Sequence, residues 1–264
     1  MTRRSLLAVF AHPDDESIAC GGLLARCAEM GVRVALVCVT RGEDGPQQET
    51  LGADRLREVR TREMQAASRI LGIDELVFLD YPDGCLPWVD EAELTDRLAG
   101  VILRLHPDVV VTFGHDGLYW HPDHVAVHER TTAAVVSLGD RAPALYYVTM
   151  PPGLVRRIVD EAMAEDVVAA RSRARGASIP VLGIDDPDAF GAAADPPTLV
   201  IDVGAWAARK LAALRCHHTQ VGGGVLSRIA DSDAPRLLGV EHFHRAAVGG
   251  SGHAFIEEMG MPCS

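Results

Sequence analysis

The feature that most constrains the fold of this chain is a regular alternation of two sequence patterns. Short runs rich in Val and Leu are typical of strands that a parallel sheet buries on both faces. They occupy residues 6–11, 32–40, 76–81, 109–113, 145–150 and 199–203. Helical patterns lie between them, at residues 22–30, 54–71, 91–105, 124–138 and 206–217. Because such alternation produces parallel strands joined by right-handed crossovers, the sequence predicts an α/β fold of three layers, a mostly parallel, Rossmann-like sheet with helices on both faces.

The chain has 264 residues, a length that one α/β domain can reach, and we expect a single domain over residues 1–264. Residues 151–197 interrupt the alternation, because they are rich in proline and contain one charged, helix-like piece at residues 155–175. Two interpretations of this stretch are open, a surface insertion and a flap over the site, since long loops in compact domains often act as lids. The tail after Gln220 shows no pattern that can be assigned.

The composition excludes several classes of partner. The 25 basic and 37 acidic residues give a net charge of −12, which argues against binding of nucleic acid or of an anionic membrane surface. No apolar run approaches the roughly 20 residues of a membrane span. The first apolar run meets His12 and Asp14 where a signal peptide would need small residues, so we expect a cytoplasmic protein. The six cysteines show no C-x-x-C spacing, and we expect reduced thiols.

Two clusters of polar side chains follow the first and the fourth predicted strands. The first cluster reads Ala-His-Pro-Asp-Asp-Glu over residues 11–16, and the second runs from His115 to His124. In open α/β sheets, ligands bind at the carboxyl ends of the strands, where the strand order reverses. If the strand order is 3-2-1-4, both clusters flank one crevice, and we expect a single site there.

The residue types in these clusters suit zinc. Catalytic zinc takes three protein ligands of the His and carboxylate type and keeps one position open. His12 and Asp15 stand three residues apart, and His124 can reach them from the other cluster. A helical pair of His124 and His128, as in H-E-x-x-H, is the alternative. We prefer His124 alone, because His128 lies a full turn deeper and is expected to pack or to support a ligand.

The two motifs together give a specific resemblance. Ala-His-Pro-Asp-Asp-Glu at residues 11–16 and His-Pro-Asp-His at residues 121–124 resemble the LmbE-like family of zinc-dependent deacetylases. That family includes N-acetylglucosaminyl-phosphatidylinositol deacetylases and the deacetylases and amidases of mycothiol and bacillithiol metabolism. The likeness covers most of the chain, including residues 40–43, 60–63, 79–84 and 210–220.

The resemblance implies a metal site and a base. By this resemblance His12, Asp15 and His124 are the ligands of zinc, or of iron(II) in the cell. Asp14 is then the general base that takes a proton from the attacking water. Asp14 and Asp15 are chemically identical neighbours, but consecutive side chains that leave a strand end point to different sides. One can therefore bind the metal while the other faces the water.

The resemblance also implies roles for residues around the metal. His121 would be a charged partner that stabilises the oxyanion or protonates the leaving amine. The Tyr119 hydroxyl would polarise the amide carbonyl, and Arg60 and Asp83 would hold sugar hydroxyls. Trp120 departs from the family, in which glycine commonly precedes His-Pro-Asp-His. A bulky indole there would narrow the pocket or offer a stacking platform to a sugar.

The residues and the resemblance together predict an enzyme. We expect a metal-dependent amide hydrolase that removes the acetyl group from a small molecule, an N-acetylglucosamine-type amino sugar or its conjugate. A rival within the enzymes is an amidase that cleaves a larger amide, such as a thiol-sugar conjugate or an N-acyl antibiotic. A rival of another class is a metal-binding protein that keeps the fold and has lost catalysis. The individual substrate and the oligomeric state, a homo-oligomer included, stay open.

Overall fold

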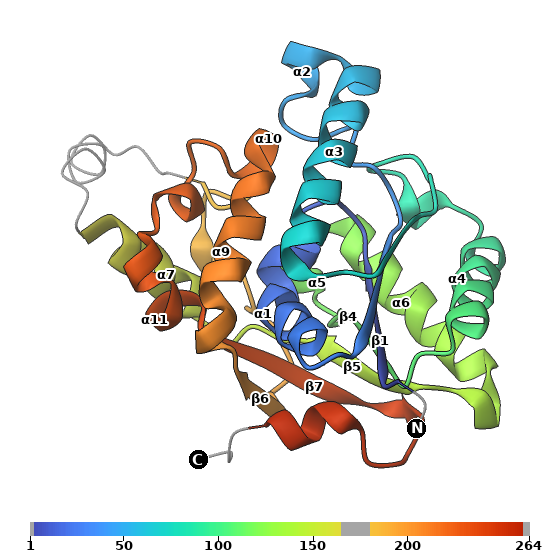
Figure 1. The fold of residues 1–264 in the computed structure, drawn as a ribbon. Helices are drawn as coiled ribbons and strands as arrows, with labels where there is room; N and C mark the ends of the chain where they lie inside the picture. The colour runs from blue at the N-terminus through green and yellow to red at the C-terminus, as the bar shows by residue number, and fades with distance from the viewer. Residues whose placement is uncertain (1–2, 165–179, 261–264) are drawn as a thin grey trace.

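The computed structural model describes residues 3–164 and 180–260 and contains one mixed sheet (Figure 1). Within these residues, seven strands follow the order β3-β2-β1-β4-β5-β7-β6. The pairs among β1 to β5 are parallel, and β7 runs antiparallel to both of its neighbours. The predicted order 3-2-1-4 and the mostly parallel sheet are confirmed. The strands are β1 Ser5–Phe10, β2 Arg33–Cys38, β3 Glu75–Phe78, β4 Val109–Phe113, β5 Ala144–Val148, β6 Leu199–Asp202 and β7 Val240–Gly249.

Helices cover both faces of the sheet, as predicted. The helices α1, α3 and α9 contact one another on one face, whereas α4 and α6 pack together on the other (Figure 1). All residues of β1 and β4 are buried between these layers. The helices are α1 Asp15–Glu29, α2 Gln48–Leu51, α3 Ala53–Leu71, α4 Glu91–Leu105, α5 Gly117–Trp120, α6 Pro122–Ser137, α7 Leu154–Ala164, α9 Ala207–Cys216, α10 His218–Val221 and α11 Ala234–Leu238.

The first helix differs most from its prediction. Residues 22–30 were expected, but α1 begins at Asp15 and is broken at Cys20, whose φ of −149° is not helical. The Glu241 carboxylate accepts hydrogen bonds from the N–H groups of Gly22 and Leu23, both at 2.8 Å, beyond the break. The periodicity at residues 22–30 therefore belongs to the second segment only. The first segment, which carries the acidic residues, begins directly at the end of β1.

The strand β7 was not predicted, because its sequence does not form a continuous apolar run. Buried Glu241 and Phe243 alternate with partly buried His242 and His244 along it. An antiparallel strand with two different faces alternates in this way. The strand inserts between β5 and β6 and so completes the sheet.

The expected flap at residues 151–197 is only partly described. The helix α7 covers part of the helix-like piece at residues 155–175, and the rest of that piece, from residue 165, lies outside the described residues. A short bridge between Val181 and Ile184 forms a tight turn. No described helix is both long and apolar enough to cross a membrane. The five described cysteines are free thiols.

Candidate active site

A cavity of about 250 Å³ opens at the carboxyl ends of β1 and β4, where the two polar clusters meet. One wall comes from the loop after β1, another from the loop after β4, and Leu182 to Ile184 add a third. Seven of the eight predicted site residues line it, and the eighth, His124, is fully buried. The seven are His12, Asp14, Asp15, Arg60, Asp83, Tyr119 and His121.

The three expected metal ligands converge on one point. His12 Nδ1 lies 3.1 Å from His124 Nε2. The Asp15 carboxylate oxygens lie 3.2 Å from His124 Nε2 and 3.5 Å from His12 Nδ1. All three side chains are nearly excluded from solvent. This donor set, two imidazole nitrogens and a carboxylate, is the kind that catalytic zinc sites use.

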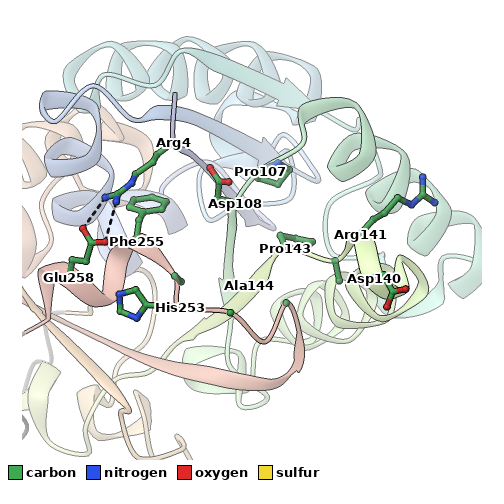
Figure 2. A pocket seen from close by; sticks show the side chains of 14 residues that line it. Arg4, Pro107, Asp108, Asp140, Arg141, Pro143, Ala144, His253, Phe255 and Glu258 are labelled. Atoms are coloured by element: carbon green, nitrogen blue, oxygen red, sulfur yellow. Dashed lines mark hydrogen bonds and ion pairs between the residues drawn. The ribbon is translucent and has the colours of Figure 1, made fainter. Parts of the chain in front are cut away.

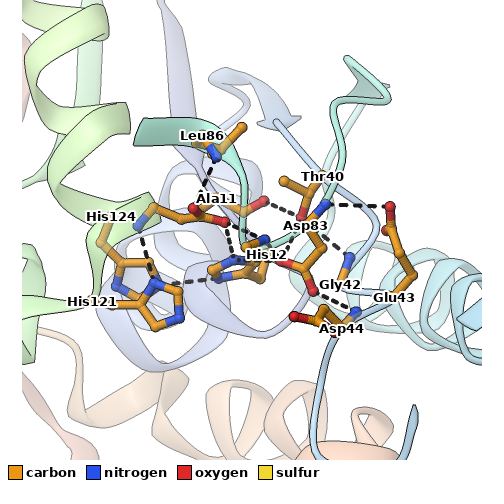
Figure 3. Close-up of polar contacts among 12 residues, drawn as sticks. Ala11, His12, Thr40, Gly42, Glu43, Asp44, Asp83, Leu86, His121 and His124 are labelled. Carbon is orange, nitrogen blue, oxygen red and sulfur yellow. Dashed lines mark hydrogen bonds and ion pairs between the residues drawn. The ribbon is translucent and has the colours of Figure 1, made fainter. Parts of the chain in front are cut away.

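The outer contacts of the two imidazoles set their tautomers. The other ring nitrogen of His12, Nε2, donates to Asp83 Oδ1 at 2.9 Å (Figure 3). It also donates to Asp123 Oδ2 at 3.2 Å. His124 Nδ1 donates to the carbonyl oxygen of Gly117 at 3.0 Å. With Nδ1 as its donor, His124 turns the lone pair of Nε2 toward His12 and Asp15. Histidines that bind a metal typically donate their other ring N–H to a carboxylate or a carbonyl oxygen in this way, so these residues fit a divalent metal.

Two other groups of potential ligands share His12, with all ligand atoms of each group within 4.8 Å of one another. These groups are His12, His121 and His124, and His12, Asp83 and Asp123. The second would use the Nε2 nitrogen, which already donates to two carboxylates. Asp15 is the carboxylate that faces both inward-facing nitrogens, at 3.2 and 3.5 Å. Asp15 as the third ligand therefore stays our prediction.

The two neighbouring aspartates have opposite electrostatic environments. Burial raises the pKa of Asp14 to about 7, although the charge of Arg60 opposes this change. Burial also acts against the charge of Asp15, but His124 and His12 outweigh it and lower the pKa of Asp15 to about 2. A carboxylate that titrates near neutrality suits a general base, and one that stays ionised suits a metal ligand.

His121 differs from the expected charged partner. Its Nδ1 accepts a hydrogen bond from the N–H of Asp123 at 3.2 Å, as the N-cap of α6. An accepting Nδ1 carries no proton, and burial together with the charge of His12 lowers the pKa of His121. The imidazole is therefore neutral in this structure, with its proton on Nε2. A neutral ring of this kind can still donate a hydrogen bond to an oxyanion.

Tyr119 lies beside the imidazoles. Its ring meets His124 edge-on at 5.3 Å between centroids and packs against Phe190 at 4.8 Å. Burial and the charges of Asp15 and Asp14 raise the pKa of Tyr119 well above its usual value. The phenol therefore stays protonated and can donate a hydrogen bond into the cavity.

The two expected sugar-binding residues are engaged with the protein itself. Arg60 is 3% exposed and donates to the carbonyl oxygens of Gly42 at 2.8 Å and Pro13 at 2.7 Å. Asp83 accepts from His12 and from the N–H of Asp44 at 2.8 Å. Both residues line the cavity, but their first role here is to fix its walls. Contact with sugar hydroxyls stays a prediction for each.

Sequence reasoning passed over Asp123, the third residue of His-Pro-Asp-His. Its carboxylate is fully buried and accepts from His12 and from the N–H groups of Gly84 at 2.9 Å and Leu86 at 3.1 Å. It therefore ties the loop after β3 to a metal ligand. His128, by contrast, donates from Nδ1 to Phe113 O at 2.9 Å, outside the group of metal ligands.

A larger cavity, of about 450 Å³, lies at the amino ends of β1, β4 and β5 (Figure 2). Three of its charged groups pair with one another or with the backbone. Arg4 pairs with Glu258 at 2.9 Å, and Asp108 accepts from the N–H of Ser5 at 2.7 Å. None of the predicted site residues lines this cavity. Its chemistry therefore marks no active site, despite its volume.

Comparisons with known proteins agree with the geometry. Residues 7–135 match the family described as "PIG-L: GlcNAc-PI de-N-acetylase". The chain is 34% identical over 266 residues to the 1D-myo-inositol 2-acetamido-2-deoxy-alpha-D-glucopyranoside deacetylase of Acidothermus cellulolyticus. That alignment covers 91% of this chain and 88% of the relative.

Two solved structures share the fold at low identity. One is the N,N'-diacetylchitobiose deacetylase of Pyrococcus horikoshii, with a TM-score of 0.61 and 20% identity over 92% of this chain and 84% of that chain. The other is the 4-carboxy-2-hydroxymuconate hydratase of Pseudomonas putida, with a TM-score of 0.63 and 19% identity. That match covers 95% of this chain and 99% of the hydratase. A hydratase on the same fold means that the fold alone does not decide the reaction. The sequence relative at 34% identity, together with both motifs, does assign the chain: it belongs to the LmbE-like, GlcNAc-PI de-N-acetylase family and is an amide hydrolase.

Proposed function

We propose that this chain is a zinc-dependent N-deacetylase that hydrolyses the acetamide of an N-acetylglucosamine-type sugar conjugate. One observation carries the proposal. Two imidazole nitrogens and an ionised carboxylate converge within 3.5 Å, beside a second carboxylate whose pKa is raised to about 7. The relative from Acidothermus cellulolyticus is named for deacetylation of an inositol glycoside of this sugar, which supports the substrate class.

His12, Asp15 and His124 would hold the zinc ion. When bound, zinc supplies a Lewis acid that polarises the acetyl carbonyl and makes water nucleophilic at neutral pH. Asp14 accepts the proton of the attacking water, and the hydroxyl oxygen forms a bond to the carbonyl carbon. Asp14 then gives this proton to the leaving nitrogen as the C–N bond breaks, which yields the free amine and acetic acid.

The remaining cavity residues stabilise and position the reacting groups. The Tyr119 hydroxyl and the Nε2–H of His121 are the donors available to the oxyanion that forms on the carbonyl oxygen. Arg60 Nη2 lies 3.3 Å from Asp14 Oδ2 and steadies the base. In this arrangement His121 is a neutral hydrogen-bond donor to the oxyanion, and Asp14 protonates the leaving nitrogen.

The charge of the cavity favours a neutral, hydroxyl-rich substrate. Carboxylates of Asp14, Asp15, Asp44 and Asp83 line it, and the guanidinium of Arg60 is occupied by protein oxygens. Hydroxyl groups can donate to such carboxylates, whereas a phosphate or a carboxylate on the substrate would be repelled. The ammonium product of deacetylation would be compatible with the same charges.

The test is a panel of N-acetylated amino sugars and their glycosides, incubated with the zinc-loaded protein. Freed primary amine is detected with a fluorescent reagent, and acetate is measured in the same samples. The Asp14→Asn variant, which keeps the ligand set, is the matched control. We expect equal amounts of amine and acetate from at least one glycoside. Amine without acetate from N-acyl compounds would favour the amidase, and no amine above the Asp14→Asn background would reject both.

A further inference from the structure

Glu16, the last residue of the Ala-His-Pro-Asp-Asp-Glu motif, is fully buried and forms a bridge between two distant parts of the chain. Its Oε2 accepts the backbone N–H of Asp14 at 3.1 Å, and its Oε1 accepts from the Ser17 hydroxyl. The same Oε1 lies 3.0 Å from His217 Nε2, and His217 is also fully buried. From the sequence, Glu16 could cap or orient neighbouring groups, or simply be a carboxylate that the dipole favours at a helix N-terminus.

The backbone that Glu16 holds is unusual. Asp14 has a φ of 118°, a conformation that a residue other than glycine adopts only at a cost in free energy. This turn directs the Asp14 side chain to Arg60 while Asp15 turns to the metal ligands. A buried carboxylate that accepts the Asp14 N–H stabilises this strained conformation. Without it, the amide would lose its partner, and Asp14 could relax to an ordinary φ.

Glu16 does not support the metal ligands in the same way. Asp15 is fixed by a separate contact, because its Oδ2 accepts the N–H of His12 at 2.7 Å. His12 and His124 are fixed by Asp83, Asp123 and the Gly117 carbonyl oxygen. Among the described contacts, the Glu16 side chain touches the base and not the ligand set. Loss of Glu16 should therefore lower kcat while the affinity for zinc stays nearly unchanged.

His217 stands behind Glu16 as the second member of the pair. It comes from the segment between α9 and α10, 201 residues further along the chain. Its Nδ1 is buried without a partner among the described residues, so its one side-chain hydrogen bond is the one to Glu16. The segment itself is anchored, since Glu63 accepts from the N–H of Thr219 at 2.9 Å and from its hydroxyl at 2.7 Å.

From these contacts we infer that Glu16 and His217 form a positioning pair, which holds Asp14 in the strained conformation that presents its carboxylate to the attacking water. Neither side chain lines the cavity, so both act through Asp14 and not on the substrate. The inference deepens the proposed deacetylation and rests on it for its kinetic consequences. The geometric consequence, the φ of Asp14, does not depend on the reaction.

Three variants test the pair. Glu16→Ala removes both contacts, and His217→Leu removes the donor but keeps an apolar volume. His217→Gln restores an N–H at a similar distance from the backbone and is the conservative rescue. We expect kcat to fall 10- to 100-fold in the first two, the usual effect of losing a supporting contact of this kind. KM and the zinc Kd, measured by competition with a chelator, should change less than about threefold, and His217→Gln should recover most of kcat.

A matched control comes from Glu241, a buried carboxylate of β7 that contacts the backbone of α1. Glu241 accepts two backbone N–H groups of this helix, as Glu16 accepts one, but it lies beyond the break at Cys20 and pairs with Lys210. The double variant Lys210→Met/Glu241→Gln removes this buried ion pair without leaving one charge alone. We expect it to lower Tm while kcat of the folded, zinc-loaded enzyme stays within about threefold of the wild type.

The outcomes are distinguishable. A normal kcat in Glu16→Ala, or a loss of zinc affinity in proportion to kcat, would overturn the positioning role. An equal loss of kcat in the control would show that any damage to α1 suffices, and would overturn it as well. If the wild type itself deacetylates no sugar, the proposed function fails. The crystal structure of Glu16→Ala then still decides the pair, which is wrong if Asp14 keeps its φ near 118°.

Discussion

Asp14 and Asp15 are consecutive residues, yet their carboxylates face different partners. Asp14 Oδ2 lies 3.3 Å from the Arg60 guanidinium, and Asp15 Oδ1 lies 3.2 Å from His124 Nε2. Their pKa values move in opposite directions, to about 7 for Asp14, which burial dominates, and to about 2 for Asp15, where the imidazoles outweigh burial. A left-handed turn at Asp14 produces this divergence. Two identical side chains thereby acquire two different environments, which suit the two functions proposed for them.

The exchange of either carboxylate for an amide should separate these functions. Asp14→Asn should keep zinc and still bind substrate but lose kcat by about 10²–10⁴-fold, the usual contribution of a general base. Asp15→Asn should lower the zinc content, and added zinc should restore part of the activity. Zinc stoichiometry and kcat are measured together for both variants. A near-normal kcat in Asp14→Asn would refute the base, and a metal-free Asp14→Asn protein would mean that the two roles are exchanged.

Metal content should depend on the three converging ligands. His12→Ala, Asp15→Ala and His124→Ala should each lower the zinc content below one ion per chain in elemental analysis. Because a ligand that binds only the folded state stabilises it by about 2.7 kcal/mol at a hundredfold excess over Kd, zinc should raise Tm of the wild type but not of His124→Ala. His128→Ala, a histidine one turn further along α6, is the control and should keep its zinc. Full occupancy in His124→Ala would point to His121 instead.

Tyr119 should act in the transition state rather than in binding. Tyr119→Phe keeps the ring that packs on Phe190 and removes only the hydroxyl. The loss of one oxyanion donor costs about 10²–10³-fold in kcat in other enzymes, and we expect a loss of this size with little change in KM. Steady-state kinetics over a range of substrate concentrations give both constants. A large rise in KM with an unchanged kcat would mean that the hydroxyl binds the sugar instead.

Trp120 should matter for large substrates. It is 55% exposed, and its φ of 63° is costly for any residue but glycine. In Trp120→Gly, relief of about 1–2 kcal/mol of backbone strain opposes the entropic cost of glycine, about 0.5–1 kcal/mol. The free energy of unfolding should therefore change little. KM should rise for glycosides with a second ring but not for N-acetylglucosamine, and equal changes in both would contradict a stacking platform.

The ion pair of Lys210 and Glu241 should dominate the stability of α1. The two charges lie 2.7 Å apart and are almost completely buried. Lys210→Met leaves the Glu241 charge without its partner, which typically costs about 3–5 kcal/mol. Urea unfolding should show this loss, and Lys210→Met/Glu241→Gln should recover part of it. A single variant as stable as the wild type would show that the ammonium contributes nothing.

The sheet could be predicted from the sequence because its central strands are buried on both faces. The prediction of residues 109–113 matches β4. The predicted strand at 32–40 is longer than β2 at both ends, and at its carboxyl end Val39 and Thr40 still donate to Phe10 O and Ala11 O. The break in α1 could not be read, since the carboxylate that stabilises it comes from Glu241, far away in the sequence. Local patterns carry no information on such distant partners.

The candidate site, like the fold, could be predicted only in part. The cluster of His12, Asp15 and His124 followed from strand order, since two loops that end adjacent strands must meet. The neutral state of His121 did not follow, because it depends on a hydrogen bond from the Asp123 N–H and on burial. The hydrogen bonds from Arg60 to carbonyl oxygens could not be predicted from the sequence either. The sequence identifies which side chains come together, whereas their protonation states and the hydrogen-bonding groups they leave unoccupied depend on three-dimensional contacts.

The hydrogen bonds of Glu241 and His217 to α1 join residues that are far apart in the sequence, which has a consequence for synthesis on the ribosome. Glu241 is made 219 residues after the Gly22 amide that it accepts, and His217 is made 201 residues after Glu16. A nascent chain therefore contains Asp14 and Glu16 well before His217 emerges to complete the pair that we infer to hold Asp14. The geometry of this carboxylate is then completed late, once most of the polypeptide has left the exit tunnel.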